Sequence, residues 1–231
     1  MDAPPVNIGF LLFPRLTQLD LTGPYEALAR VPGARPHLLW KDTAPVTSDT
    51  GLSILPTTRL ADCPALDVLC VPGGPGVNAM LEDTEVLEFV AAQGQTARYV
   101  TSVCSGALIL GAAGLLRGYR AATHWASMDF LTAFGAEPQA IRVCRDRNRL
   151  TGGGVTAGID FGLTLAAELA GQAAAEMIQL YMEYDPSPPF SAGSPMSASA
   201  DLVEEYGRRS APMLEQRRTA VAQAALRLAQ A

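Results

Sequence analysis

The segment VTSVCSGALILG, at residues 100–111, most constrains the fold because it puts a cysteine between two buried elements. Residues 98–103 have the composition of a short buried strand, and residues 107–113 have the small, apolar side chains of a closely packed helix. Cys104 therefore falls on the turn that joins them. A sharp strand-to-helix turn of this kind, a nucleophile elbow, raises one side chain above the edge of a sheet.

Two interpretations of Cys104 follow from these local features. The unpaired N–H groups that open a helix favour a thiolate, so the position predicts a lowered pKa and a nucleophile at neutral pH. The alternative is a packed structural thiol, since free cysteine is among the most buried residue types. The small neighbours Ser105 and Gly106 suit a tight turn, and a Gly-Gly-Pro turn after an earlier strand provides a facing wall. Local features alone leave both interpretations open.

The composition of the whole chain excludes several classes of protein. Its 231 residues are enough for one large domain, and no apolar run approaches the length that spans a bilayer. A net charge of −6 without a block of basic residues argues against nucleic acid as the main partner. The acidic, proline-containing start does not resemble a secretory signal, so we expect a cytoplasmic protein that contacts neither nucleic acid nor membrane.

Cysteine and histidine are too sparse and too scattered to predict a zinc site or a disulfide framework. None of the cysteines has CxxC spacing. The residues concerned are Cys63, Cys70, Cys104, Cys144, His37 and His124.

Strands and helices alternate along the chain, which predicts a three-layer α/β sandwich with a mostly parallel sheet. The expected strands are residues 7–13, 35–41, 67–71, 98–103 and 149–151. The expected helices between and after them are residues 17–30, 83–92, 107–113, 156–169 and 172–184.

The remaining segments have weaker patterns. Residues 42–50 are polar and contain a proline, which predicts a loop without chemistry, and residues 51–60 predict a hairpin arm or a short strand pair. Residues 125–134 favour a helix, and residues 140–144 favour a strand joined to the next by a turn at 145–148. Residues 184–200 are rich in proline, serine and glycine and should be irregular.

The C-terminal segment predicts a long helix over residues 201–230, broken or kinked near Pro212. We therefore expect an α/β domain at residues 1–200 and a helical extension at residues 201–231 packed on it. The pattern leaves open whether this extension covers an active site, completes a dimer or packs on the surface.

Reactive groups of an open α/β sheet gather beyond the carboxyl ends of its strands. Asp20, the pair Gly73 and Gly74, Cys104 and residues 152–156 all follow predicted strands, so the topology brings them together. The plainer interpretations are a solvated or capping aspartate at position 20 and an ordinary strand-to-helix turn at residues 72–76.

Several motifs in fixed order resemble the PfpI-type, glutamine-amidotransferase-like superfamily and, within it, the isonitrile hydratases. The resemblance covers about residues 7–196 and leaves the segment after Ala200 unassigned. The motifs are QLDLTGPYEAL at 18–28, VPGGPG at 71–76, VCSGALILGAAGLLRGYRAATHW at 103–125, TGGGVTAGIDFGL at 151–163 and EYDPSPPFSAGSP at 183–195.

The resemblance implies a flavodoxin-like homodimer without a metal or an organic cofactor, and a small-molecule isonitrile as its substrate. The implied reaction is hydration of the isonitrile to an N-substituted formamide. Carried over by position, Cys104 is the nucleophile and Asp20 is the acidic partner, where many relatives have glutamate. Ser105 supplies the hydroxyl beside the nucleophile, where the isonitrile hydratases tend to have threonine.

These residue types suit the implied chemistry. The terminal carbon of an isonitrile accepts a soft nucleophile, so the Cys104 thiolate is expected to form a thioimidate while Asp20 donates a proton. Asp20 would then activate the water that releases the formamide. Backbone N–H groups of the Gly73–Gly74 turn and of Ser105 are the expected donors to an anionic intermediate.

Two further residues have open roles. His124 is a candidate for a Cys-His-acid triad, although we favour a hydrogen-bonded structural histidine beside Trp125. Val155 follows the triple glycine at 152–154, and we expect its backbone carbonyl to approach the Cys104 thiol, so that ionisation or acylation of the thiol would loosen the helix that follows. The plainer interpretation of Val155 is a flexible turn without that contact.

Three competing functions remain. The first is a glyoxalase-like or peptidase-like enzyme that uses the same cysteine; such relatives more often have glutamate at position 20. The second is the sensory domain of a transcription regulator, which the short and weakly basic segment at 201–231 disfavours. The third is a redox-sensing or stress-response protein in which Cys104 is oxidised.

Overall fold

A seven-stranded sheet forms the centre of the computed structural model, which describes residues 4–230. Its strand order is β10-β11-β7-β6-β1-β2-β5, and every neighbouring pair is parallel except β10 with β11. The strands are β1 (Val6–Leu11), β2 (Ala34–Trp40), β5 (Thr58–Arg59), β6 (Val68–Val71), β7 (Tyr99–Val103), β10 (Val143–Asp146) and β11 (Arg149–Gly152).

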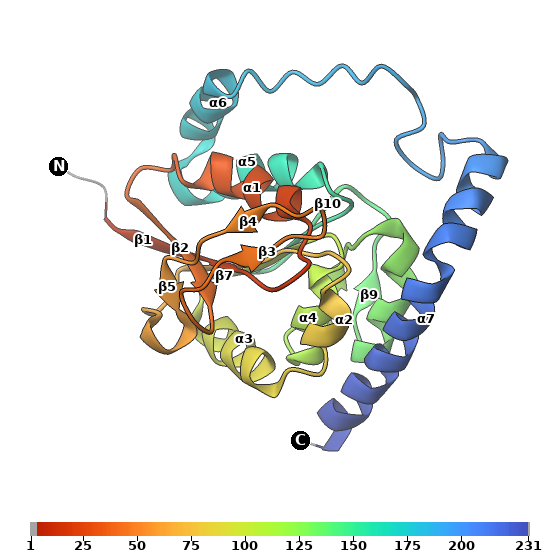
Figure 1. Ribbon diagram of the computed structural model, residues 1–231. Helices are drawn as coiled ribbons and strands as arrows, with labels where there is room; N and C mark the ends of the chain where they lie inside the picture. Colours follow the sequence, from red (N-terminus) through yellow and green to blue (C-terminus); the bar gives the residue numbers. More distant parts are fainter. Residues whose placement is uncertain (1–3, 231) are drawn as a thin grey trace.

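Helices cover both faces of the sheet, which confirms the predicted three-layer sandwich (Figure 1). On one face α1 (Gln18–Leu28) packs against α5 (Ala157–Ala170), and α6 (Gln172–Tyr181) follows α5. The other face carries α2 (Val77–Met80), α3 (Thr84–Thr96) and α4 (Gly106–Ala112). With both faces covered, β6 and β7 are buried along their whole length, which explains their continuous apolar sequences.

The register of three strands places the candidate site at one edge of the sheet. Ser102 of β7 lies opposite Val71 of β6 on one side and opposite Thr151 of β11 on the other. The three strands therefore end at the same level. The segments that leave them, Pro72 onward, Cys104 onward and Gly153 onward, meet at the carboxyl edge.

The small elements differ in part from the predictions. Residues 42–50 are not loop throughout, because β3 (Val46–Thr47) pairs with β4 (Ser53–Ile54), whereas β5 joins the main sheet. The segment η2 (Trp125–Phe134) is a 3₁₀ helix. It is followed by β9 (Glu137–Pro138), which pairs with β8 (Arg120–Ala121), and a 3₁₀ turn, η1 (Leu60–Asp62), precedes β6.

The C-terminal helix α7 (Ala200–Gln230) runs without a break through Pro212, so of the predicted break or kink the break is wrong and the kink stays a prediction. Proline removes one backbone hydrogen bond, but α7 packs along η2, α2 and α4, and this tertiary contact holds the helix together. Residues 184–199 contain neither helix nor strand, as predicted, and lead from α6 to α7 (Figure 1).

The ends of the chain limit what is described. Residues 1–3 and 231, which belong to the predicted units 1–200 and 201–231, lie outside the described residues. The division into these two units stays a prediction. None of the helices within residues 4–230 is both long and apolar enough to cross a membrane.

Candidate active site

Cys104 occupies a strained turn between β7 and α4. Its φ of 55° lies in the left-handed region, which a side chain other than glycine rarely adopts. The Cys104 N–H donates to the carbonyls of Gly152 at 3.0 Å and Gly153 at 2.9 Å, and the Cys104 carbonyl accepts from Thr123 Oγ1 at 2.7 Å. These bonds fix the strained backbone, which is the geometry expected of a nucleophile elbow.

Backbone packs directly on backbone where the Cys104 turn meets the turn after β6. A Cβ atom at Gly106 would lie 2.2 Å from the Val71 carbonyl oxygen, and one at Gly73 would lie 2.5 Å from the Ser105 nitrogen. Neither position has room for a side chain. The sequence motifs with glycine at these positions therefore bring two loops into contact at the carboxyl edge of the sheet.

Asp20 lies in the first turn of α1 and is completely buried, so it is not a solvated aspartate. Its Oδ2 accepts from the Gly73 N–H at 3.1 Å, and its Oδ1 has no hydrogen-bond partner within residues 4–230. Burial raises the pKa of Asp20 to about 7, although the Cys104 thiol and the Gly73 N–H favour the charged form. The carboxyl group is thus poised to gain or lose a proton near neutral pH.

The predicted thiolate at Cys104 is not what the structure indicates. Burial raises the pKa of the Cys104 thiol, and the negative charge of Asp20 raises it further. The Ser105 N–H and the charge of Arg217 act in the opposite direction but are weaker. A short helix N-terminus does not outweigh this desolvation, so the thiol is protonated at neutral pH until a base takes its proton.

The backbone donors predicted for an anionic intermediate already have acceptors. The Gly74 N–H donates to Ser105 Oγ at 3.0 Å, and the Gly73 N–H is bound to Asp20. The Ser105 N–H interacts with the Cys104 sulfur. In this state the glycine turn holds the two side chains that flank the nucleophile, and its role as an anion site stays a prediction.

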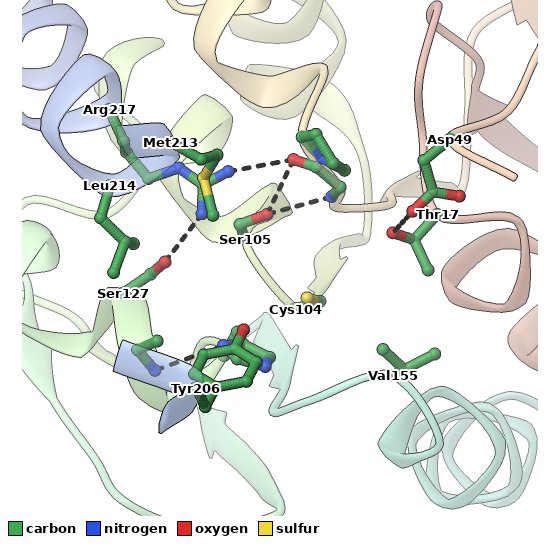
Figure 2. Close-up of a pocket in the computed structure, with 14 residues that line it drawn as sticks. Thr17, Asp49, Cys104, Ser105, Ser127, Val155, Tyr206, Met213, Leu214 and Arg217 are labelled. Carbon is green, nitrogen blue, oxygen red and sulfur yellow. Dashed lines mark hydrogen bonds between the residues drawn. The ribbon is translucent and has the colours of Figure 1, made fainter. Parts of the chain in front are cut away.

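A cavity of about 200 Å³ opens beside Cys104 (Figure 2). Val155 lines it from the segment that precedes α5, and Thr17 lines it with Asp49, to which its Oγ1 donates at 2.9 Å. Helix α7 supplies Tyr206, Met213, Leu214 and Arg217 to the same cavity.

Val155 shares the cavity with Cys104. The carbonyls that accept from the Cys104 N–H are those of Gly152 and Gly153, which precede Val155 in the same segment. The approach of the Val155 carbonyl to the thiol, and the loosening of α5 that would follow from it, stay predictions.

His124 caps η2. Its Nδ1 accepts from the Ala126 N–H at 3.2 Å, and its ring stacks on Tyr206 with the centroids 6.1 Å apart. Burial lowers the pKa of His124, and the nearby Arg217 lowers it further, so the ring is neutral. These contacts fit the structural role favoured from the sequence, and the acid that interacts with Cys104 is Asp20.

Three lining residues were missed by the sequence interpretation: Asp49, Tyr206 and Arg217. Asp49 lies in the segment to which no chemistry was assigned. Arg217 had a local signal, because it falls in the buried stripe that continues with Ala220, Val221 and Ala224. A charged residue at a buried helical position is rare unless it has a partner or a function.

The fold and the site together define an α/β protein with a cysteine elbow. Comparison with known families makes the assignment specific, and the chain belongs to the DJ-1/PfpI family, whose model matches residues 6–168. This confirms the resemblance inferred from the motifs. The match ends before the segment that follows α5.

Three relatives extend the comparison. The chain is 56% identical over 223 residues to the isonitrile hydratase of Pseudomonas putida, covering 96% of this chain and 98% of that protein. A solved THiJ/PfpI family protein from Pseudomonas syringae matches with a TM-score of 0.93 and 47% identity, covering 95% of this chain and 92% of that one. The transcriptional regulator GbdR of Pseudomonas aeruginosa is 34% identical over 70% of this chain, which spans only 46% of the regulator.

Proposed function

We propose that this chain hydrates isonitriles, R–N≡C, to N-substituted formamides. The observation that carries the proposal is the 56% identity to an isonitrile hydratase across almost the full length of both proteins. The site supports it independently, because a strained cysteine lines a small cavity and interacts with a buried carboxyl group whose pKa is about 7. The glyoxalase-like, peptidase-like and regulatory alternatives have no comparable observation in their favour.

The first step adds the thiol across the isonitrile carbon. With Asp20 ionised, its carboxylate takes the proton of the Cys104 thiol, and the sulfur attacks the terminal carbon of the isonitrile. Asp20 then gives that proton to the same carbon. The product is a thioimidate, R–N=CH–S–Cys104, and no atom has been lost from either reactant.

The second step hydrolyses the thioimidate. Asp20, again a carboxylate, removes a proton from a water molecule that attacks the thioimidate carbon, and passes this proton to the nitrogen. The carbon–sulfur bond of the tetrahedral intermediate then breaks, the proton of its hydroxyl group reaches the sulfur through Asp20, and R–NH–CHO leaves. One carboxyl group thus serves as base and acid in both steps, which requires a pKa near the working pH.

The cavity supports a compact, uncharged substrate. Its volume is about 200 Å³, and Val155, Met213 and Leu214 give it part of an apolar lining. An alkyl isonitrile has an apolar body and a carbon terminus that accepts hydrogen bonds. We therefore propose small alkyl or cycloalkyl isonitriles as the substrate class.

The proposal is tested by measuring the hydration of an isonitrile by the purified protein. Purified protein is incubated with a simple alkyl isonitrile, and formation of the N-alkyl formamide is followed by NMR, with Cys104→Ala as the inactive control. Parallel incubations with a 2-oxoaldehyde and with a peptide examine the glyoxalase-like and peptidase-like alternatives. Turnover of either of these without hydration of the isonitrile would overturn the proposal.

We also propose that the chain works as a homodimer in the cytoplasm. Large apolar side chains are exposed on α6 and on the connection after it, among them Leu180, Tyr181 and Phe190, which supports a second copy as their cover. The cysteines at 63, 70, 104 and 144 are all free, as is usual in a reducing compartment. Gel filtration with light scattering tests the dimer.

A further inference from the structure

Arg217 carries a positive charge into the interior beside the nucleophile turn. Its side chain reaches from the middle of α7 and is only 3% exposed. Its Nε donates to Asn78 Oδ1 at 2.8 Å. Its other two bonds are drawn in Figure 2: Nη1 donates to Ser127 Oγ at 2.8 Å, and Nη2 donates to the Gly74 carbonyl at 3.0 Å. All three acceptors are neutral.

Within residues 4–230 no carboxylate forms an ion pair with Arg217. Nine other arginines and Lys41 do pair with acidic side chains in this part of the chain. A buried, unpaired guanidinium is costly to fold around. A helix that needed only to be anchored would be stabilised better by an apolar side chain at this position.

The Arg217 guanidinium lies where its positive charge can act on the nucleophile turn. Arg217 lines the same cavity as Cys104 and Ser105. The other titratable groups around that cavity come from α1, the β3–β4 connection, the segment before η2 and α7. They are Asp20, Asp49, His124 and Tyr206.

The bond to Gly74 also bears on Ser105. The Gly74 carbonyl accepts from Arg217 at 3.0 Å and from Ser105 Oγ over a longer 3.4 Å. The charged donor therefore makes the stronger bond. Because the Gly74 N–H already occupies one acceptor site of Ser105 Oγ, the Ser105 hydroxyl hydrogen is left weakly held and available to a ligand.

We propose that Arg217 is a positioning residue, which brings a cation without an acidic partner from the C-terminal helix to the nucleophile turn, stabilises negative charge on the Cys104 sulfur and competes with the Ser105 hydroxyl for the Gly74 carbonyl. The role concerns the thiol itself and does not depend on which substrate the enzyme uses. It also makes α7 part of the active site rather than a surface extension. Consistent with this, the charge of Arg217 lowers the pKa of Cys104 against the larger, opposing effects of burial and of Asp20.

The test measures the reactivity of the Cys104 thiol, which needs no substrate. The rate of alkylation by iodoacetamide is followed between pH 6 and 10 by mass spectrometry of the Cys104 peptide in the full chain. The variants are Arg217→Met, which removes the charge, and Arg217→Lys, which keeps it. Arg227→Met is the matched control, because Arg227 is on the same helix and also donates to a core carbonyl, that of Leu81, but lies outside the cavity.

Removing the cation and loosening α7 would change the alkylation rate of Cys104 in opposite directions. Arg217→Met is expected to slow alkylation of Cys104 about tenfold above pH 7, because the loss of one nearby positive charge raises the pKa of the thiol. A loosened α7 would instead expose the thiol and speed the reaction. Arg217→Lys is expected to stay within about threefold of the parent chain, and Arg227→Met to match it.

Two results would overturn the proposal: an Arg217→Met rate equal to or faster than that of the parent chain, or an Arg217→Lys rate as slow as that of Arg217→Met. If Arg217→Met does not fold, as judged by circular dichroism, Arg217→Gln replaces it. Glutamine keeps an amide donor for the Gly74 carbonyl but has no charge, and the same two outcomes decide.

Discussion

The Asp20 carboxyl group interacts with the Cys104 thiol in a buried site, where the thiol favours ionisation of Asp20 and the charged Asp20 opposes ionisation of the thiol. Burial raises the pKa of Asp20 to about 7, and the charge that Asp20 acquires above that pH raises the pKa of the thiol. The pair therefore carries two protons in acid and one above neutrality. Addition of a thiol across an isonitrile requires the form with one proton.

This proton count predicts the pH dependence of hydration. The value of kcat/KM should rise with pH and level off above an apparent pKa of about 7, because only ionised Asp20 can take the proton of Cys104. The measurement is the initial rate of formamide formation between pH 5 and 9. A rate that is independent of pH across this range, or that falls through pH 7, contradicts the assigned role of Asp20.

The buried carboxyl group should also make the protein less stable above pH 7. The pKa of Asp20 rises from its ordinary value of 3.8 to about 7 on folding, so the folded state binds the proton more tightly. Protonated Asp20 therefore contributes about 4 kcal/mol to the free energy of unfolding below pH 3.8, and this contribution is lost as the pH rises through 7. Asp20→Asn should remove this dependence.

Urea unfolding at pH 8 checks this second prediction. Asp20→Asn is expected to unfold at higher urea than the parent chain while losing hydration activity. The difference should shrink as the pH is lowered toward 5. A variant that is less stable than the parent at pH 8 would show that the carboxylate is stabilised by its surroundings instead.

Close packing of the two turns predicts that Gly73 tolerates no side chain. In Gly73→Ala the new Cβ would lie 2.5 Å from the Ser105 nitrogen and 3.0 Å from Asp20 Oδ2. The displacement should cost about 1–3 kcal/mol of unfolding free energy and about a hundredfold in kcat. Gly207→Ala is the control, because no atom lies within 4 Å of the added Cβ, and it should raise stability by up to about 1 kcal/mol at unchanged activity.

Participation of α7 in the cavity predicts a change of substrate size preference. Leu214 is half-buried and lines the cavity beside Arg217. Leu214→Ala should raise kcat/KM for a bulky isonitrile relative to a small one by about tenfold, since a few carbon atoms in an apolar pocket discriminate on that scale. Competition between two alkyl isonitriles measures the ratio. An unchanged ratio would show that Leu214 does not contact the substrate.

Local sequence patterns predicted the elements that place the nucleophile. The apolar strands β1, β6 and β7 and the small residues around Cys104 fix the turn geometry within a few residues, so no long-range information was needed. Asp20 was placed correctly because it follows a strand of the parallel sheet. The local sequence did not predict that Asp20 and Cys104 are buried. This burial raises the pKa of the Cys104 thiol, whereas the turn alone predicted a lowered pKa.

The parts of the site that the sequence did not predict come from distant segments. Arg217 is separated by more than one hundred residues from Gly74, and only the docking of α7 brings them together. Asp49 reaches the cavity because the β3–β4 hairpin folds over Thr17, in a stretch whose polar sequence predicted only a loop. Pro212 indicated a break in α7 that tertiary packing overrides.

Mass spectrometry of the reacting protein can detect the proposed bond between the isonitrile carbon and the Cys104 sulfur. The protein is mixed with an alkyl isonitrile, quenched in acid at short times, and digested. We expect a Cys104 peptide that is heavier by the full mass of the isonitrile, appears before the formamide and disappears when the substrate is exhausted. Formamide produced without this adduct, or by Cys104→Ala at a rate near that of the parent chain, would contradict it.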